Sequence, residues 1–188
     1  MKRILVLAGT ILGGVAVLSL GAVTGHQYRA AAFKRTSLPV DPGAHYWLAP
    51  GDLLITRSNT PALVGHAAIY SGSPSPCIYP DLMMNLETND ATVNRRFVWY
   101  WLQSPVARQF IERNAKGTSP SMRKISQGTV MAIPFPVGLS LAAQRRLVGE
   151  LDAIQEQMFA LMRLQAETAS QINGLLPSIL DRAFKGEL

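Results

Sequence analysis

The segment from Ser140 to Leu188 constrains this chain most, because apolar residues recur there in alternating steps of four and three. This spacing is a heptad seam, and it predicts one long helix from Leu141 to about Leu176. Such a helix would run roughly 54 Å, too far to be covered by a domain of about a hundred residues. The seam therefore predicts pairing with a second long helix, which the rest of the chain does not supply. Its apolar positions are Leu147, Leu151, Ile154, Met158, Leu161, Ile172, Leu175 and Ile179, and its polar positions are Gln165 and Thr168.

The positive charge is distributed unevenly. The chain has 188 residues and a formal net charge of +6. Residues 28–130 hold eleven Lys or Arg and six Asp or Glu, whereas residues 131–188 hold five and six. A basic middle region favours a polyanionic partner, although ordinary solubility explains the charge equally well when it is taken alone.

An uncharged stretch of 22 residues, from Ile4 to Gly25, lies near the start. It is long enough to span a bilayer, so a membrane anchor is one interpretation and a misassigned start is the other. Cys77 is the single cysteine. It excludes a disulfide within the chain and a cysteine-based metal site, and it favours a reducing compartment.

Apolar runs bounded by turn residues predict a small mixed α/β domain of the α+β type between the two ends. Residues 94–115 read as a helix that breaks and restarts at Ser104-Pro105, with serine as the N-cap and proline in the first helical position. The aromatic run 99–101 is expected in the core rather than stacked on bases. Ser140 is the expected cap of the long helix. The predicted strands are 52–57, 66–70, an apolar run at 82–84, and 130–133, with a turn at 58–61.

Three enzyme-like patterns are incomplete. His66 and Cys77 are similar to the base and nucleophile of an exported papain-like Cys/His hydrolase, but Cys77 does not start a helix that would lower its pKa. Asp81 and Glu87 resemble paired nuclease carboxylates, but the expected nearby lysine is absent. No glycine-rich phosphate loop follows a strand. We therefore expect no catalytic residue, metal or cofactor, with the hydrolase as the alternative.

Two basic loops predict contact with nucleic acid instead. One follows the strand at 52–57 and the other follows the helix at 94–115. Arg and Lys can reach phosphates or guanine edges, Asn can pair with adenine, and Ser or Thr can serve either. The second loop ranks first because it carries more donors. The predicted DNA-binding residues are Arg57, Ser58, Asn59, Lys116, Gly117, Thr118, Ser119, Arg123 and Lys124.

Several longer stretches carry a resemblance to a known family. They are PGDLLITRSNTP at 50–61, VGHAAIY at 64–70, CIYPDLMM at 77–84, RFVWYWL at 96–102, KGTSPSMRKI at 116–125, QRR at 144–146, LD at 151–152 and LLPSILDRAFKG at 175–186. Through them, the chain from about Phe33 to Leu188 resembles the second half of a specificity subunit of type I restriction–modification systems, which serve bacterial defence.

The resemblance implies a protein that performs no chemistry itself. A full subunit of this family has two target-recognition domains, each followed by a long conserved helix. The two helices pair antiparallel and set the distance between the half-sites of a split DNA target, which the domains read from the major groove through their loops. The helices dock methyltransferase (modification) subunits, which bring S-adenosylmethionine. The restriction/translocase subunit brings ATP and Mg²⁺.

The resemblance covers one recognition domain and one helix, so we expect a half subunit that forms a homodimer or pairs with another half subunit. An inactive truncated remnant is the other interpretation. The predicted divisions are an apolar segment at 1–27, a DNA target-recognition domain at 28–138 and a coiled-coil helix at 139–188. The apolar segment is expected to replace the usual start of the recognition domain. A cytoplasmic location is expected, with anchoring by residues 4–25 left open.

Overall fold

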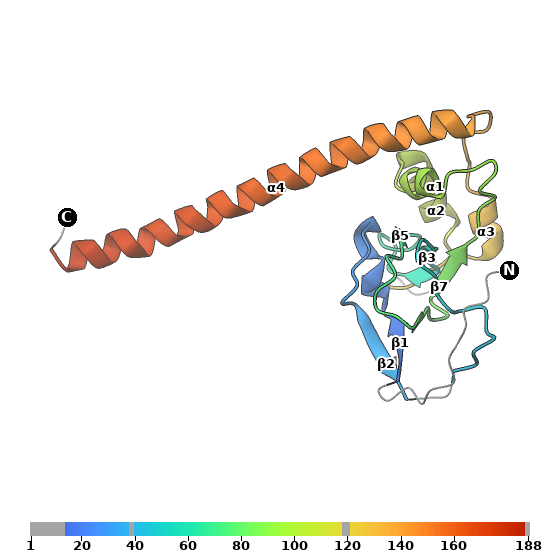
Figure 1. The fold of residues 1–188 in the computed structure, drawn as a ribbon, viewed down its shortest axis with the longest axis horizontal. Coiled ribbons are helices and arrows are strands. Elements are labelled where there is room, and N and C mark those ends of the chain that lie inside the picture. Colours follow the sequence, from blue (N-terminus) through green and yellow to red (C-terminus); the bar gives the residue numbers. More distant parts are fainter. Residues whose placement is uncertain (1–13, 38–39, 118–120, 187–188) are drawn as a thin grey trace. The chain divides into compact units, whose positions relative to one another are not determined.

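The computed structural model describes residues 14–37, 40–117 and 121–186 (Figure 1). The chain divides into two units, and the division falls between Gln144 and Arg145. In the described part of the first unit, the strands are β1 (Val15–Leu18), β2 (Phe33–Thr36), β3 (Leu53–Thr56), β4 (Ser58–Asn59), β5 (Ala67–Ile69), β6 (Cys77–Ile78), β7 (Met83–Leu86) and β8 (Arg123–Lys124). Its helices are η1 (Leu20–Ala22), η2 (Thr24–His26), α1 (Arg95–Trp101), α2 (Pro105–Asn114) and α3 (Gln127–Met131).

The described strands form two three-stranded sheets and one two-stranded ribbon. The first sheet has the order β2-β1-β6, in which β1 is antiparallel to β2 and parallel to β6. The second has the order β5-β3-β7 and is antiparallel throughout. The ribbon pairs β4 with β8, so that Ser58 lies opposite Lys124 and Asn59 opposite Arg123.

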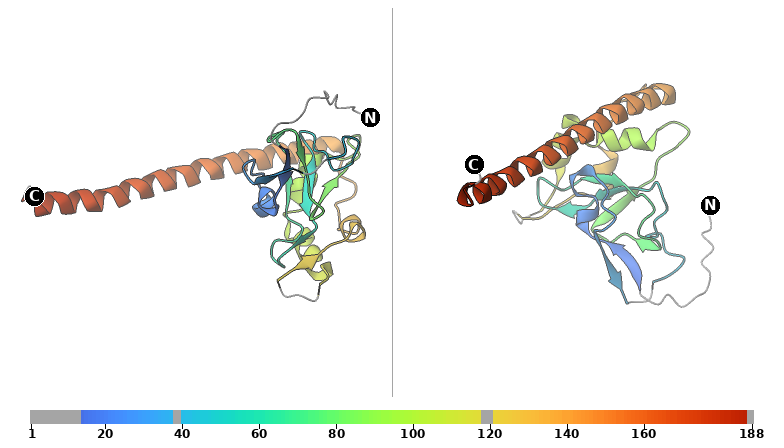
Figure 2. Two further views of the ribbon diagram at one scale, coloured as in Figure 1. Left: turned by 90° about the horizontal axis from the view of Figure 1, so that it is seen from below. Right: turned by 60° about the vertical axis from the view of Figure 1, so that its left-hand side comes forward.

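Strand β3 separates two hydrophobic clusters. Leu54 packs into one cluster with Leu18 of β1, whereas Leu53 and Ile55 pack into the other with Trp99 of α1. Successive side chains of a strand point to opposite faces, so a strand buried on both faces reads as an unbroken apolar run. The layers are therefore sheet, sheet and helices, as Figures 1 and 2 show. This is the predicted α+β class.

The N-terminal apolar segment forms part of this core. Residues 14–25 contain β1 and the first helical turns, and Ala16, Leu18 and Ala22 are buried in the first cluster. A membrane anchor over residues 4–25 is therefore wrong from residue 14 onward, because a short apolar run is also what a fully buried strand looks like. The boundary predicted at residue 28 is wrong for the same reason. Residues 1–13 lie outside the described residues. Among those described, no helix has the length and apolarity to cross a membrane.

Helix α2 starts where the sequence predicts, whereas α3 lies where the sequence predicts a strand. Ser104 caps α2 by accepting a hydrogen bond from the Ala107 backbone N–H, with Pro105 in the first helical position, as predicted. The strand predicted at 130–133 is wrong, because α3 includes the first two of these residues and a turn contains the other two. Ser126 and Thr129 form a reciprocal capping box, which satisfies backbone donors at a helix start and so favours helix over strand.

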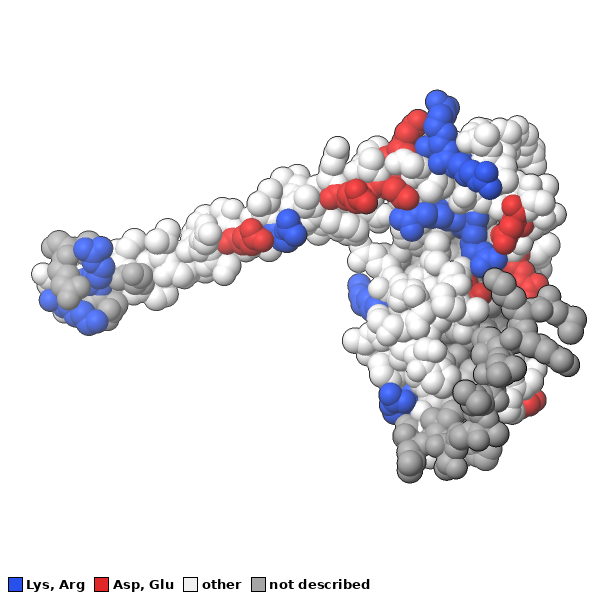
Figure 3. Space-filling model, viewed as in Figure 1, with Lys and Arg blue, Asp and Glu red and all other residues white. Residues whose placement is uncertain are grey.

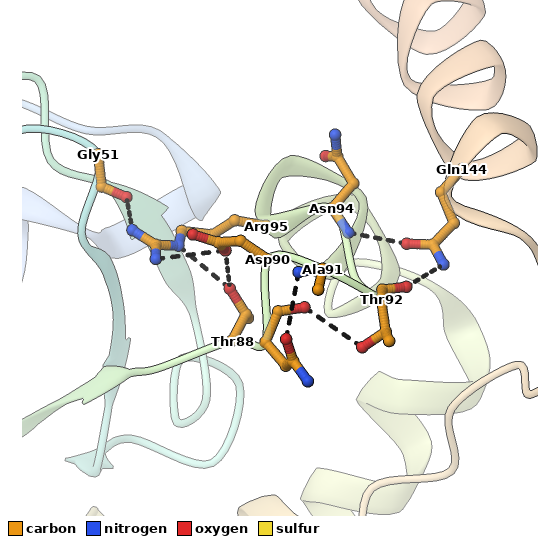
Figure 4. A network of polar contacts seen from close by, with 9 residues as sticks. Gly51, Thr88, Asp90, Ala91, Thr92, Asn94, Arg95 and Gln144 are labelled. Atoms are coloured by element: carbon orange, nitrogen blue, oxygen red, sulfur yellow. Dashed lines mark hydrogen bonds and ion pairs between the residues drawn. The ribbon is translucent and has the colours of Figure 1, made fainter.

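Gln144 attaches the first turn of the long helix to the first unit (Figure 4). Its buried amide donates to the carbonyls of Thr92 and Leu139 at 3.1 and 3.0 Å, and it accepts from the Asn94 N–H at 2.9 Å. A buried amide with both ends satisfied is a stable anchor. The unit therefore extends to Gln144, beyond the predicted boundary at residue 138. Ser140 caps this turn, as predicted, by accepting from the Ala143 N–H at 3.2 Å.

The long helix α4 (Leu141–Phe184) contains 44 residues and confirms the prediction of one extended C-terminal helix. It continues past the predicted end at Leu176 with Pro177 inside it. A proline inside a helix removes one backbone hydrogen bond and crowds the carbonyl four residues earlier, at a cost of about 3 kcal/mol. From Leu151 onward the apolar seam residues are exposed within the chain, from 37% at Leu151 to 61% at Ile154, whereas Leu147 is partly buried. On the face shown in Figure 3, uncharged surface separates the charged groups along this helix.

Candidate nucleic-acid interface

The β4–β8 ribbon brings the two predicted basic loops together. Lys116 and Lys124 exchange two backbone hydrogen bonds, of 2.8 and 2.7 Å, at the edge of this ribbon. Ile125 donates its N–H to the Arg57 carbonyl at 2.9 Å. Four basic residues from segments far apart in the sequence therefore lie on one small structure. We call Arg57, Lys116, Arg123 and Lys124 the basic cluster.

The members of the basic cluster differ in how they are held. Arg57 forms an ion pair with Asp81 at 2.7 Å, and Arg123 donates to the Gly117 carbonyl at 2.8 Å. The side chains of Lys116 and Lys124 are exposed, and in the described part of the chain neither has an ion-pair partner. An exposed ion pair contributes only about 0–1 kcal/mol, so Arg57 can exchange its carboxylate for another anion. The cluster offers strong positive charge to solvent.

Two predicted base-contacting residues are buried instead. Ser58 is 2% exposed and Asn59 is 9% exposed. The Asn59 side-chain oxygen accepts from the Thr60 N–H at 2.9 Å, a local turn contact. The prediction that Ser58 and Asn59 reach DNA is therefore wrong, because the segment expected to be an exposed turn is a strand covered by its neighbours.

Gly117 has a structural role in the second loop. Its φ is +151°, and a Cβ at this position would lie 2.6 Å from the Met122 carbonyl oxygen. Only glycine allows the two backbones to approach this closely. The residue therefore closes the base of the loop that carries Lys116 and Lys124. Thr118 and Ser119, the other predicted contacts, lie outside the described residues.

The structure weakens both enzyme alternatives. Cys77 is buried in β6, and burial raises the pKa of its thiol to about 11, opposite to what a nucleophile needs. His66 accepts the Gly25 N–H at Nδ1 and lies against His26, with ring centroids 4.3 Å apart. Asp81 is engaged by Arg57. In the described parts of the chain, no group of three or more His, Cys, Asp or Glu is placed to hold a metal.

A polar hollow that the sequence did not reveal adjoins the basic cluster. It has a volume of about 370 Å³, and Arg57 and Asp81 are among its lining residues. Asn85 of β7 and Gln127 at the start of α3 also line it, together with the ring of Tyr79. Tyr79, Asp81 and Asn85 belong to one segment at 79–85, whereas Arg57 and Gln127 come from segments far from it in the sequence. No local motif could have indicated that they meet.

Two solved chains from type I restriction–modification systems are similar in structure to this chain. One such chain, from work on the complex assembly and conformational transition of a type I R-M system, matches 94% of this chain at 26% sequence identity with a TM-score of 0.65. The HsdS subunit from Thermoanaerobacter tengcongensis matches 96% at 23% identity with a TM-score of 0.48.

The first of these similarities confirms the predicted resemblance to type I specificity subunits and the predicted fold class. In both comparisons this chain spans 40% of the length of the matched chain. No protein-family model matches the sequence, and no curated protein matches it either.

Proposed function

We propose that this chain is a half specificity subunit, which reads one half of a split DNA target and joins a second half through α4. The observation that carries the proposal is the pairing of β4 with β8, which gathers four basic side chains from two separate loops. The similarity to a type I restriction–modification chain supports it. In this role the chain recognises DNA and catalyses no step itself.

The basic cluster would position the domain on duplex DNA. Lys116 and Lys124 are exposed cations suited to phosphate oxygens, which supply the sequence-independent part of binding. Arg57 lies beside the polar hollow, where a guanidinium can also reach a guanine edge. The cluster thus combines groups for positioning with a group for base contact.

The seam of α4 would pair with a second copy in antiparallel orientation. A two-fold axis between Ala166 and Glu167 places Gln165 opposite Thr168, so the two polar members face each other. The same register sets Leu161 opposite Ile172, Met158 opposite Leu175 and Ile154 opposite Ile179. Polar residues in a coiled-coil seam specify register, and here they favour one alignment. Between Ile154 and Ile179 the apolar seam residues are matched on both sides of this centre, which supports a homodimer.

A second apolar stripe would dock the modification subunits. Phe159, Met162 and Leu180 are 43%, 56% and 47% exposed and fall outside the seam. Their spacing follows the same heptad, displaced by one residue from the seam. Pairing through the seam would leave this stripe open to a methyltransferase subunit, which would bring S-adenosylmethionine. The restriction/translocase subunit would join the same assembly.

Fluorescence anisotropy with a labelled random duplex tests the DNA-binding part. We expect the wild-type chain to bind with an affinity that falls steeply between 50 and 200 mM salt, as multiple phosphate contacts require. A double variant, Lys116→Ala with Lys124→Ala, should bind far more weakly. Arg163→Ala, an exposed charge on α4, is the matched control. Equal binding by all three proteins, or no binding by the wild type, would reject the proposal, and the latter result would favour a remnant.

A further inference from the structure

We infer that Asn85 and Gln127, on the wall of the polar hollow beside Arg57, are base-reading residues of the domain. This inference rests on the proposed DNA-binding function and adds a specificity site to it. We assign base contact to the hollow and not to the predicted turn at 58–59, because the side chains of Ser58 and Asn59 are buried.

The two amides converge from different elements. Asn85 comes from β7, which forms one edge of the sheet β5-β3-β7, and its backbone pairs with Leu54. Gln127 is the first residue of α3, three positions after Lys124 of the ribbon. Both therefore lie on regular elements, which hold a side chain more firmly than a loop does.

The side-chain amides of Asn85 and Gln127 are available for a ligand. Neither side chain hydrogen bonds to another group within the described parts of the chain, and Gln127 is exposed. An amide presents a donor and an acceptor in one plane, the arrangement that matches N6 and N7 of adenine in the major groove. The hollow thus offers unsatisfied groups of the type that reads base edges.

The charges around the hollow determine which part of a duplex would face it. On the wall, Asp81 is paired with Arg57 and their charges offset each other, whereas Lys116 and Lys124 on the adjoining ribbon would attract a phosphate. A carboxylate can instead accept from the amino group of cytosine. The backbone of a duplex would therefore follow the lysines, with base edges turned toward Asn85 and Gln127.

Selection from a random duplex library, followed by sequencing, tests this inference on the full chain. We expect the wild type to enrich a motif, and Asn85→Ala or Gln127→Ala to relax one position of it by roughly 10- to 100-fold. Asn85→Asp should shift its position from adenine toward cytosine, because a carboxylate only accepts. Lys124→Ala should lower the affinity for every duplex and keep the motif. Gln109→Ala, an exposed glutamine on α2, is the matched control.

The outcomes separate this inference from the function on which it rests. A wild-type motif that stays unchanged in the Asn85 and Gln127 variants would overturn the assignment and leave DNA recognition standing. A wild type that enriches nothing would overturn both. Circular dichroism verifies that each variant is folded, and the exposed Gln127 keeps the test decisive if a change at Asn85 disturbs β7.

Discussion

Replacing Leu161 with alanine should weaken self-association strongly. Leu161 is 57% exposed within the chain and lies on the seam of α4. The change removes three carbon groups, and the burial of each one contributes about 0.8 kcal/mol to association. Scaling their sum by the exposed fraction of Leu161 gives a loss of about 1.4 kcal/mol for each copy. Two copies contribute to each pair, so the loss is about 3 kcal/mol. The dissociation constant should rise roughly 100-fold.

Sedimentation equilibrium over a range of concentrations measures this effect. Phe159→Ala is the control, since Phe159 is 43% exposed on the same helix and lies outside the seam. We expect its effect on self-association to stay below about threefold. Alanine favours helix, so neither change should unwind α4. Equal weakening by both variants, or no effect of Leu161→Ala, would refute the assignment of the seam.

Four further predictions follow from the same structure. Lys124→Ala should reduce the slope of log affinity against log salt by about 1 for every duplex, as measured by anisotropy. Gly117→Ala should lower the melting temperature, because the added Cβ would lie 2.6 Å from the Met122 oxygen, while Gly149→Ala, with open space around it, should not. Burial and the neighbouring His66 lower the pKa of His26 from 6.5 to about 3. Between these two pH values the folded chain therefore binds fewer protons than the unfolded chain. The unfolding free energy should therefore fall as the pH drops below 6.5, by at most about 2 kcal/mol at pH 5, and urea melts of wild type and His26→Asn would measure the difference. The Cys77 thiol should resist iodoacetamide at neutral pH, because burial raises its pKa to about 11, and fast alkylation of the folded chain would revive the hydrolase alternative.

Local signals in the sequence predicted much of the fold. Strand β3 is an apolar run between turn residues, Ser104 and Pro105 mark the start of α2, and the heptads define α4. In each case the physical cause lies within a few residues of its effect. These elements were therefore accessible without any knowledge of tertiary contacts.

The missed features depend on contacts between distant segments. The pairing of Ser58 with Lys124 turns an apparent loop into a buried strand, and no local pattern encodes that partner. The meeting of Asn85 and Gln127 beside Arg57 is likewise a product of the tertiary fold. The sequence of β1 is compatible with part of a membrane span, because a short buried strand and a piece of an apolar helix have the same composition.

The mass of the complex with duplex DNA tests the account most directly. Sedimentation velocity on the full chain, with a duplex carrying the selected motif, reports how many copies bind. We predict two copies on each duplex, reduced to one by Leu161→Ala at concentrations where the wild type still pairs. A wild-type complex that holds a single copy at saturation, with α4 unpaired, would contradict the account.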